Sequence, residues 1–318
     1  MDGPCGGHYS PPYQVTADHK MHNQAYGKHR LPGDWRRWLI GELSLRRMMI
    51  SLIEIYIALL VFAWLFSDRL IFPPPPPSYQ EGGDFYRIPL PDGQKIGMLA
   101  LTNPAAAFTL LYFHGNAEDL GDIQPTLQKY RDHGFTVYAV DYRGYGISDG
   151  RAGSHAACED GEAALKHLVA DRGIPLNRLI LHGRSVGTGI ALHLAARNPV
   201  AGLILESPFV TAFRVRTVIP IAPIDKLRNN KRIRQISCPL LVIHGVDDAI
   251  IPQWHGQKLY DLATVPKRCW WVPLANHNDI LERDEPGYWR HLTEFRDWVG
   301  TLEKTEPRDG HLNFRKDK

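Results

Sequence analysis

Cysteine is scarce in this chain of 318 residues, which contains only Cys5, Cys158, Cys238 and Cys269. None of them stands in a CxxC pair, so the sequence offers neither a zinc-ligand pattern nor a disulfide scaffold. Cys238 and Cys269 each begin an apolar run. They could lie side by side, but the pattern favours two buried thiols.

A large excess of charge of either sign is also missing. The formal net charge is +3. The body of the chain has no basic stripe interleaved with aromatic side chains, which argues against nucleic-acid binding. The length allows one large α/β domain with an appendage, or two small domains.

Long hydrophobic runs are absent with one exception, MMISLIEIYIALLVFAWLF at residues 48–66. At about 1.5 Å per residue this run spans roughly 28 Å, close to the ~30 Å hydrocarbon core of a bilayer. Its Leu, Ile, Val and Phe residues favour insertion by about 5 kcal/mol, whereas Glu54 opposes it by about 2.5–3.5 kcal/mol. We expect a transmembrane helix. A buried core helix is the alternative, which is disfavoured because a spacer follows the run.

The flanks of the run predict a signal anchor and its orientation. Residues 1–47 lack apolar periodicity and are expected to be a disordered basic leader. No small-x-small cleavage site follows the run. Basic residues crowd the twenty positions before it, whereas Arg69 is alone in the twenty after it, so the positive-inside rule places the leader in the cytoplasm and the catalytic domain on the non-cytoplasmic side. The basic residues before the run are Lys28, Arg30, Arg36, Arg37, Arg46 and Arg47.

A Pro-rich spacer is expected at residues 67–84. It contains FPPPPPS at 72–78, which predicts a semi-rigid polyproline segment that holds the following domain just off the bilayer. A polar tail is expected at 303–318.

Between the spacer and the tail, residues 85–302 alternate between strand-like and helix-like segments. Apolar runs of strand length separated by helices predict a mainly parallel sheet with helices on both faces. In such sheets, ligands bind at the carboxyl ends of the strands. The expected strands are 95–101, 108–113, 135–140, 178–182, 201–206, 239–244 and 268–273; the expected helices are 122–133, 156–171, 186–197, 253–263 and 286–302.

Three of the expected strands run into the same dipeptide, His-Gly, at His114, His182 and His244. Three histidines at one sheet edge raise the possibility of a metal site. The spacing lacks an acidic residue that would complete a ligand pattern, and glycine after each histidine suits a tight strand-to-loop turn. The sequence therefore predicts no metal.

The segment LILHGRSVGTG at 179–189 places Ser185 between Gly183 and Gly187, where a strand gives way to a helix. A nucleophile on such a sharp turn is held above the sheet, and the turn leaves no room for side chains two residues before and after it. A phosphate-binding turn is the alternative, but it would need GxGxxG or a lysine, and Arg184 stands in neither place. Ser185 is therefore the candidate nucleophile.

A serine hydroxyl needs a histidine base that a carboxylate orients. GVDDAIIP follows the strand at 239–244 and offers Asp247 and Asp248, and LANHNDI follows the last strand and offers His277. The order serine, acid, histidine suits a nucleophile carried on a strand-to-helix turn. Taken alone, Asp248 would be read as a turn-capping carboxylate and His277 as a surface histidine. Together with Ser185 they predict a catalytic triad.

An oxyanion hole needs two N–H donors. One is expected from Val186, the residue after the nucleophile. The other is expected from Asn116, which comes directly after His-Gly in YFHGNAED at 112–119.

A cap is expected at residues 207–236, which mix apolar residues with seven Arg or Lys and one Asp. A basic, apolar cap beside a bilayer would suit anionic lipid or acyl-chain substrates. A solvated cap surface is the equal alternative.

Five segments together resemble the α/β-hydrolase superfamily over roughly residues 68–302: YFHGNAEDL, VDYRGYGISDG, LHGRSVGTG, IHGVDDAIIP and NHNDI. They are most similar to its membrane-anchored branch, which includes bud-emergence-type proteins and depalmitoylases. The resemblance implies an α/β-hydrolase fold with a short cap and no metal or organic cofactor. It also implies that Ser185 and His277 belong to the triad with Asp248, the fifth residue of HGxxD, as the acid. The depalmitoylases carry an N-terminal cysteine cluster, where this chain has Cys5 and a hydrophobic span.

The sequence thus predicts a membrane-anchored serine hydrolase that cleaves carboxylic esters or thioesters, with lipid or acyl substrates favoured. Its expected partners are the bilayer, through residues 48–66, and a small acyl or lipid substrate. A serine peptidase of the same fold and a non-enzymatic membrane-tethered scaffold are the alternatives.

Overall fold

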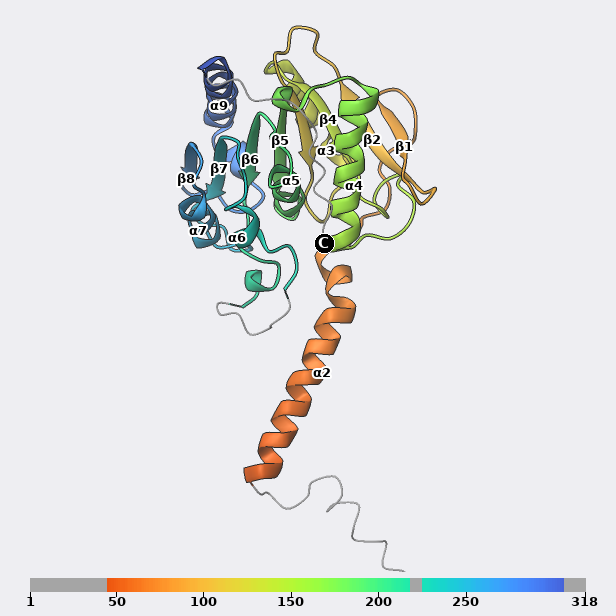
Figure 1. Ribbon diagram of the computed structural model, residues 1–318, viewed down its shortest axis with the longest axis vertical. Coiled ribbons are helices and arrows are strands. Elements are labelled where there is room, and N and C mark those ends of the chain that lie inside the picture. The colour runs from red at the N-terminus through yellow and green to blue at the C-terminus, as the bar shows by residue number, and fades with distance from the viewer. Residues whose placement is uncertain (1–44, 218–224, 306–318) are drawn as a thin grey trace, which may run out of the picture. The chain divides into compact units, whose positions relative to one another are not determined.

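The computed structural model describes residues 45–217 and 225–305 (Figure 1). The chain divides into two compact units, Met1–Tyr56 and Ile57–Lys318. The leader up to residue 44, the middle of the expected cap at 218–224 and the tail beyond residue 305 lie outside the described residues.

The hydrophobic run forms one helix, α2, from Leu45 to Ile71. It contains the whole predicted span of 48–66 and extends beyond it at both ends. In the described part of the chain this is the one helix that is long and apolar enough to cross a membrane, and none of its most apolar window is buried inside the protein. This exposure argues against the alternative of a buried core helix.

The domain that follows is built on an eight-stranded sheet in the order β1-β2-β4-β3-β5-β6-β7-β8. The six strands from β4 to β8 in this order are parallel to one another, whereas β1 pairs antiparallel with β2 and β2 pairs antiparallel with β4. The prediction of a mainly parallel sheet is confirmed. The strands are β1 Phe85–Pro89, β2 Lys95–Leu101, β3 Thr109–Phe113, β4 Thr136–Val140, β5 Leu179–Arg184, β6 Gly202–Glu206, β7 Leu240–Gly245 and β8 Lys267–Val272.

Helices cover both faces of this sheet (Figure 1). Side chains alternate along each strand, so β3 sends Leu111 and Phe113 into the core beneath α4 and α5, and Leu110 and Tyr112 into the core beneath α3 and α9. This two-sided burial explains why the strands read as continuous apolar runs in the sequence. The helices are α3 Leu120–Asp132, α4 Ser154–Lys166, α5 Gly187–Ala195, α6 Asn229–Arg232, α7 Trp254–Leu262, α8 Ile280–Arg283 and α9 Glu285–Thr305.

Parts of the domain differ from the sequence-based prediction. The short helices α6 and α8 have no counterpart among the expected helices. The strand β1 was not expected, because FYRIP carries an arginine and a proline and lies at the sheet edge, where it pairs only with β2. The helix expected at 156–171 is α4 followed by a π-helical turn, His167–Asp171.

The Pro-rich spacer packs against the domain at both of its ends. Phe72 is buried and meets the ring of Tyr142 edge-on at 5.9 Å. At the other end the Ser78 backbone N–H donates to Asp119 at 2.7 Å, and the Tyr79 hydroxyl donates to Asp141 at 2.5 Å. The segment is therefore fastened to the loops at the carboxyl ends of β3 and β4.

The cysteines follow the sequence prediction in part. Cys238 is buried and free, whereas Cys269 is only half-buried because it lies on β8, the strand at the edge of the sheet.

Candidate active site

Ser185 occupies the sharp turn between β5 and α5. Its φ of 52° lies in the left-handed region, which a serine adopts at a cost of order 1–3 kcal/mol. A Cβ on Gly187 would lie against the carbonyl of Phe113, and one on Gly183 would lie against the Gly187 backbone. The glycines flanking the serine are therefore required by backbone contact, as the sequence analysis expected.

The structure brings Ser185, His277 and Asp248 together around one point at the carboxyl edge of the sheet. The His277 Nε2 atom lies 2.9 Å from Ser185 Oγ, and the His277 Nδ1 atom lies 2.7 Å from Asp248 Oδ2. All three residues are almost fully buried. Each follows a different strand, β5, β7 or β8, so the arrangement depends on the whole parallel sheet.

Asp248 is held as a carboxylate by several donors. Its Oδ1 atom accepts the N–H groups of Ile250 at 2.9 Å and Ile251 at 2.7 Å. Burial favours the neutral acid, but hydrogen bonds from His244 and His277 outweigh it and hold the pKa of Asp248 well below its usual range. Asp247, the other candidate acid, is exposed.

The loop after β3 carries Asn116, and His114 fixes its backbone. The His114 Nδ1–H donates to the Gly115 carbonyl at 2.6 Å. Across a trans peptide the N–H of Asn116 must then point the opposite way. His114 is itself held by Asp141, 3.1 Å from its Nε2 atom, and both side chains are fully buried. Burial alone would lower the pKa of His114, but the contact with Asp141 outweighs it and raises that pKa.

Arg184, the residue before the serine, links three loops of the site. Its guanidinium donates to both oxygens of Glu118 at 2.9 Å and to the Asn278 side chain at 2.9 Å. Glu118 in turn accepts the N–H of Gly115 at 2.6 Å. The same arginine lies 3.4 Å from Glu206, at the end of β6. The loop after β3 and the loop after β8, which carries His277, are therefore held by one side chain.

The sequence patterns do not identify this supporting layer, which consists of Glu118, Asp141, Arg184 and Glu206. One signal was available, because each of these residues stands at or just beyond the carboxyl end of an expected strand. Position alone does not say which carboxylate meets which cation.

The three histidines of the His-Gly dipeptides serve different partners and do not converge on a common point. His182 lies 3.3 Å from Glu206, and His244 donates to the carbonyl of Ile251 at 2.8 Å. Within residues 45–217 and 225–305, no group of three His, Cys, Asp or Glu side chains could hold a metal ion.

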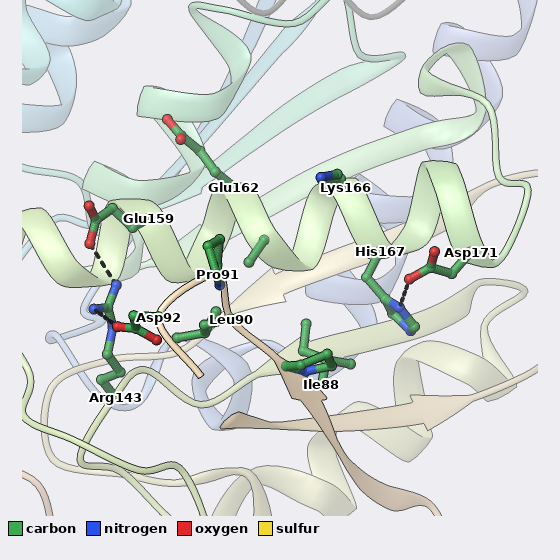
Figure 2. A pocket seen from close by; sticks show the side chains of 12 residues that line it. Ile88, Leu90, Pro91, Asp92, Arg143, Glu159, Glu162, Lys166, His167 and Asp171 are labelled. Atoms are coloured by element: carbon green, nitrogen blue, oxygen red, sulfur yellow. Dashed lines mark hydrogen bonds and ion pairs between the residues drawn. The ribbon is translucent and has the colours of Figure 1, made fainter. Parts of the chain in front are cut away.

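A separate cleft of about 720 Å³ lies away from the triad, between the loop after β1 and α4 (Figure 2). Its floor is apolar and its rim is charged. Most of these charges have partners: Arg143 contacts Asp92 at 3.4 Å and Glu159 at 2.6 Å, His167 contacts Asp171 at 2.7 Å, and Glu162 contacts His193, outside the cleft, at 2.6 Å.

Of the cap expected at 207–236, the structure describes residues 207–217 and 225–236. Cations of the cap have partners in the protein. Lys226 forms an ion pair with Asp68 at 2.7 Å, Arg232 donates to the Gly189 carbonyl at 3.1 Å, and the Arg214 guanidinium lies over the Trp254 ring at 4.9 Å. The basic character of the cap is therefore used in part to hold it against the domain.

A serine on a tight turn after the fifth strand of a mainly parallel, helix-covered sheet defines the α/β-hydrolase fold. A family model described as "Serine aminopeptidase, S33" matches residues 104–229. The alpha/beta hydrolase domain-containing protein aho-3 of Caenorhabditis elegans is 36% identical over 180 residues, which cover 56% of this chain and 54% of that protein. The human alpha/beta hydrolase domain-containing protein 17B is 34% identical over 194 residues, covering 59% of this chain and 67% of its own.

The chain belongs to the α/β-hydrolase family. Its match spans about half the length of the nematode relative and two thirds of the human one. Among solved structures, the Pyrococcus furiosus esterase Pf2001 superimposes with a TM-score of 0.56 at 19% identity, over 71% of this chain and 98% of that esterase. At this identity the likeness concerns the fold.

Proposed function

We propose that this protein is a membrane-anchored serine hydrolase that cleaves carboxylic ester or thioester bonds. The observation that carries the proposal is the 2.9 Å distance between His277 Nε2 and Ser185 Oγ, with Asp248 on the other imidazole nitrogen. This is the arrangement in which a histidine activates a serine hydroxyl. Membership of a hydrolase family supports it independently.

The reaction begins when His277 accepts the Ser185 proton as the oxygen attacks the substrate carbonyl. Asp248 stabilises the imidazolium that forms, because its carboxylate is held ionised. The N–H groups of Val186 and Asn116 donate to the carbonyl oxygen as it becomes negative. His277 then protonates the leaving alcohol or thiol, and an acyl group remains on Ser185.

Hydrolysis of the acyl-enzyme repeats these steps with water. His277 accepts a proton from the water as it attacks the acyl carbonyl, and returns it to Ser185 Oγ as the acid leaves.

A fluorophosphonate probe tests the nucleophile directly. We expect the wild-type protein to be labelled and Ser185→Ala to be unlabelled, with unchanged circular dichroism. Asp247→Asn is the matched control, because it removes the exposed neighbour of Asp248 and should label normally. Well-folded wild-type protein that does not react with the probe would support the non-enzymatic scaffold.

A serine peptidase is the second candidate, favoured by the description of the matching family model. A series of p-nitrophenyl esters of increasing chain length, compared with aminoacyl p-nitroanilides, separates the two. We expect turnover of the esters and a preference for longer acyl chains. Faster turnover of the anilides would assign the peptidase.

We also propose that residues 48–66, within α2, are a signal anchor, with residues 1–47 in the cytoplasm and the catalytic domain on the non-cytoplasmic side. The uneven distribution of basic residues around the run supports this orientation. Protease added to intact cells should digest the domain and spare an N-terminal tag. Protection of the domain with loss of the tag would reverse the orientation.

A further inference from the structure

Exposed apolar side chains gather on the loops that carry the triad. In the described part of the chain beyond α2, the large apolar side chains that stand exposed are Val246, Ile250 and Leu274, at 42, 45 and 70%. All three follow the carboxyl ends of β7 and β8. The two loops are joined by backbone hydrogen bonds, including that from Asp247 N–H to the Ala275 carbonyl at 3.0 Å. The domain thus exposes its large apolar groups beside Asp248 and His277.

Both the exposure and the backbone conformation of Leu274 are energetically unfavourable for a leucine. It is the most exposed of the three, and its φ of 61° lies in the left-handed region, which leucine rarely adopts. Asparagine or glycine would occupy this turn with less strain. Exposure and backbone strain together, on a loop that carries part of the triad, favour a partner outside the protein for this side chain.

The same edge of the domain holds the end of α2. Asp68 accepts hydrogen bonds from the Ser154 N–H at 3.0 Å and from the Ser154 hydroxyl at 2.7 Å, and it pairs with Lys226 at 2.7 Å. These three residues belong to one compact unit. Ser154 begins α4, the helix that follows β4, and so stands at the carboxyl edge of the sheet. Asp68 is therefore fastened at the edge that carries Ser185.

The membrane lies close to this edge if residues 48–66 cross it. Asp68 follows that run almost directly in the sequence, so it lies at the bilayer surface together with the groups that bind it. The exposed apolar loops share the carboxyl edge of the sheet with these groups. Contact with lipid would remove the apolar side chains from water, at about 25 cal/mol per Å² of apolar surface.

We propose that Val246, Ile250 and Leu274 form a lipid-contacting surface that rests on the bilayer in which the chain is anchored. The triad then receives long-chain esters or thioesters that are embedded in that bilayer. This inference rests on the proposed hydrolase function and on the membrane span. It adds the route by which substrate reaches Ser185 and the side chains that contact lipid.

Two substrates separate this inference from the hydrolase proposal. Full-length protein in phosphatidylcholine vesicles is assayed with p-nitrophenyl acetate, which arrives from water, and with p-nitrophenyl palmitate embedded in the same vesicles. We expect Val246→Thr combined with Leu274→Asn to lower turnover of the embedded ester by about tenfold and to change turnover of the acetate by less than about twofold. Asparagine tolerates the backbone of residue 274, so folding is preserved.

Val265→Thr is the matched control. It makes the same change as Val246→Thr on a half-buried valine just before β8, at the amino edge of the sheet, and should affect neither substrate. An equal fall with both substrates in the double variant, or no change with either, would overturn the inference. Absence of turnover of both substrates by the wild-type protein would count against the hydrolase proposal instead.

A measurement that does not depend on activity tests the contact itself. A nitrobenzoxadiazole label on Leu274→Cys, in a background with Cys5→Ser and Cys269→Ser, should be quenched by lipids brominated near the headgroup end of the acyl chains. The same label on Val265→Cys should not be quenched. Equal quenching at the two positions, or none at either, would show that this edge does not contact lipid. A change in oligomeric state confined to the double variant would assign the surface to a second copy of the chain.

Discussion

Two buried histidine–carboxylate pairs lie at the carboxyl edge of the sheet, and they differ in the group that the second imidazole nitrogen contacts. In one, His277 lies between Asp248 and the Ser185 hydroxyl, with 2.7 and 2.9 Å contacts. In the other, His114 lies between Asp141 and the Gly115 carbonyl, with 3.1 and 2.6 Å contacts. The carboxylate is common to both pairs, and the difference lies at the far imidazole nitrogen.

That difference decides what each histidine can do. A hydroxyl can give up its proton, so His277 faces a group that it can activate. A carbonyl can only accept a hydrogen bond, so His114 must keep its Nδ1 proton and holds the backbone of the loop after β3 in place. A histidine beside a carboxylate is therefore not evidence of catalysis until its second partner is known.

The largest expected effect on kcat comes from removing the negative charge of Asp248 in the His277–Asp248 pair. Asp248→Asn leaves the shape of the site but favours the imidazole tautomer that cannot accept the Ser185 proton, so kcat should fall by about 10⁴-fold. Steady-state turnover of p-nitrophenyl acetate measures it. Asp247→Asn should stay within about twofold of wild type because that side chain is exposed. Comparable losses in the two variants would mean that the acid has been misassigned.

The second pair should affect kcat through the oxyanion hole. His114→Gln removes the donor that fixes the Gly115 carbonyl, and kcat should fall by about 10²-fold with little change in KM, the effect of losing one well-placed oxyanion donor. His182→Gln is the comparison, because His182 is equally buried but contacts Glu206 and Tyr130. It should lower the melting temperature and leave kcat within about fivefold. If both variants lose only stability, His114 has no part in positioning the loop.

A smaller effect on kcat is expected from changing Arg184, which links the loop after β3 to the loop that carries His277. In Arg184→Lys, a single ammonium cannot reach Glu118, Asn278 and Glu206 at once as the guanidinium does. We expect kcat to fall by about tenfold and fluorophosphonate labelling to slow in parallel, because both depend on the aligned loops. Arg131→Lys, which changes an exposed arginine paired with Asp132, should behave as wild type. Normal labelling with impaired turnover would contradict the proposed role of Arg184.

The smallest effect concerns pH and a third histidine. His255 Nδ1 accepts the N–H of Val210 in the cap region, and burial, together with repulsion from His244, lowers its pKa to about 4 from a usual value of 6.5. The folded state then binds this proton less readily than the unfolded state does. Stability from this group is therefore complete above pH 6.5 and is lost as the pH falls towards 4.

Melting temperatures measured between pH 4 and 7 test this dependence. His255→Asn keeps an acceptor for Val210 but cannot be protonated, so its melting temperature should fall less steeply over that interval than that of the wild type. Parallel slopes for the two proteins would show that the pKa of His255 is the same in the folded and unfolded states.

Much of the fold was predictable from the sequence, because burial on both faces leaves a strong signal. Strand β2 was predicted with its observed bounds, and β3 to β8 to within a residue or two at each end. Strand β1 gave no such signal. It lies at the sheet edge and carries Arg87 and Pro89, so its sequence shows neither a continuous apolar run nor a regular alternation of apolar and polar residues.

The residues of the candidate site were predictable because each sits at the end of a strong strand signal. Ser185, Asp248 and His277 could be proposed from order and spacing, and their mutual distances agree with that proposal. Their supports could not be predicted in this way. The pairing of Arg184 with Glu118, or of His114 with Asp141, depends on the strand order β4-β3-β5-β6, which the sequence does not state.

The fastening of the Pro-rich segment has a practical consequence for work with the isolated domain. The apparent boundary at residue 85 would remove Ser78 and Tyr79 and leave the carboxylates of Asp119 and Asp141 without those donors. It would also uncover the pocket that Phe72 fills. A fragment for crystallisation should therefore retain Asp68, which binds Ser154 and Lys226, and everything after it. The stretch of prolines belongs to the folded domain and is not a dispensable linker.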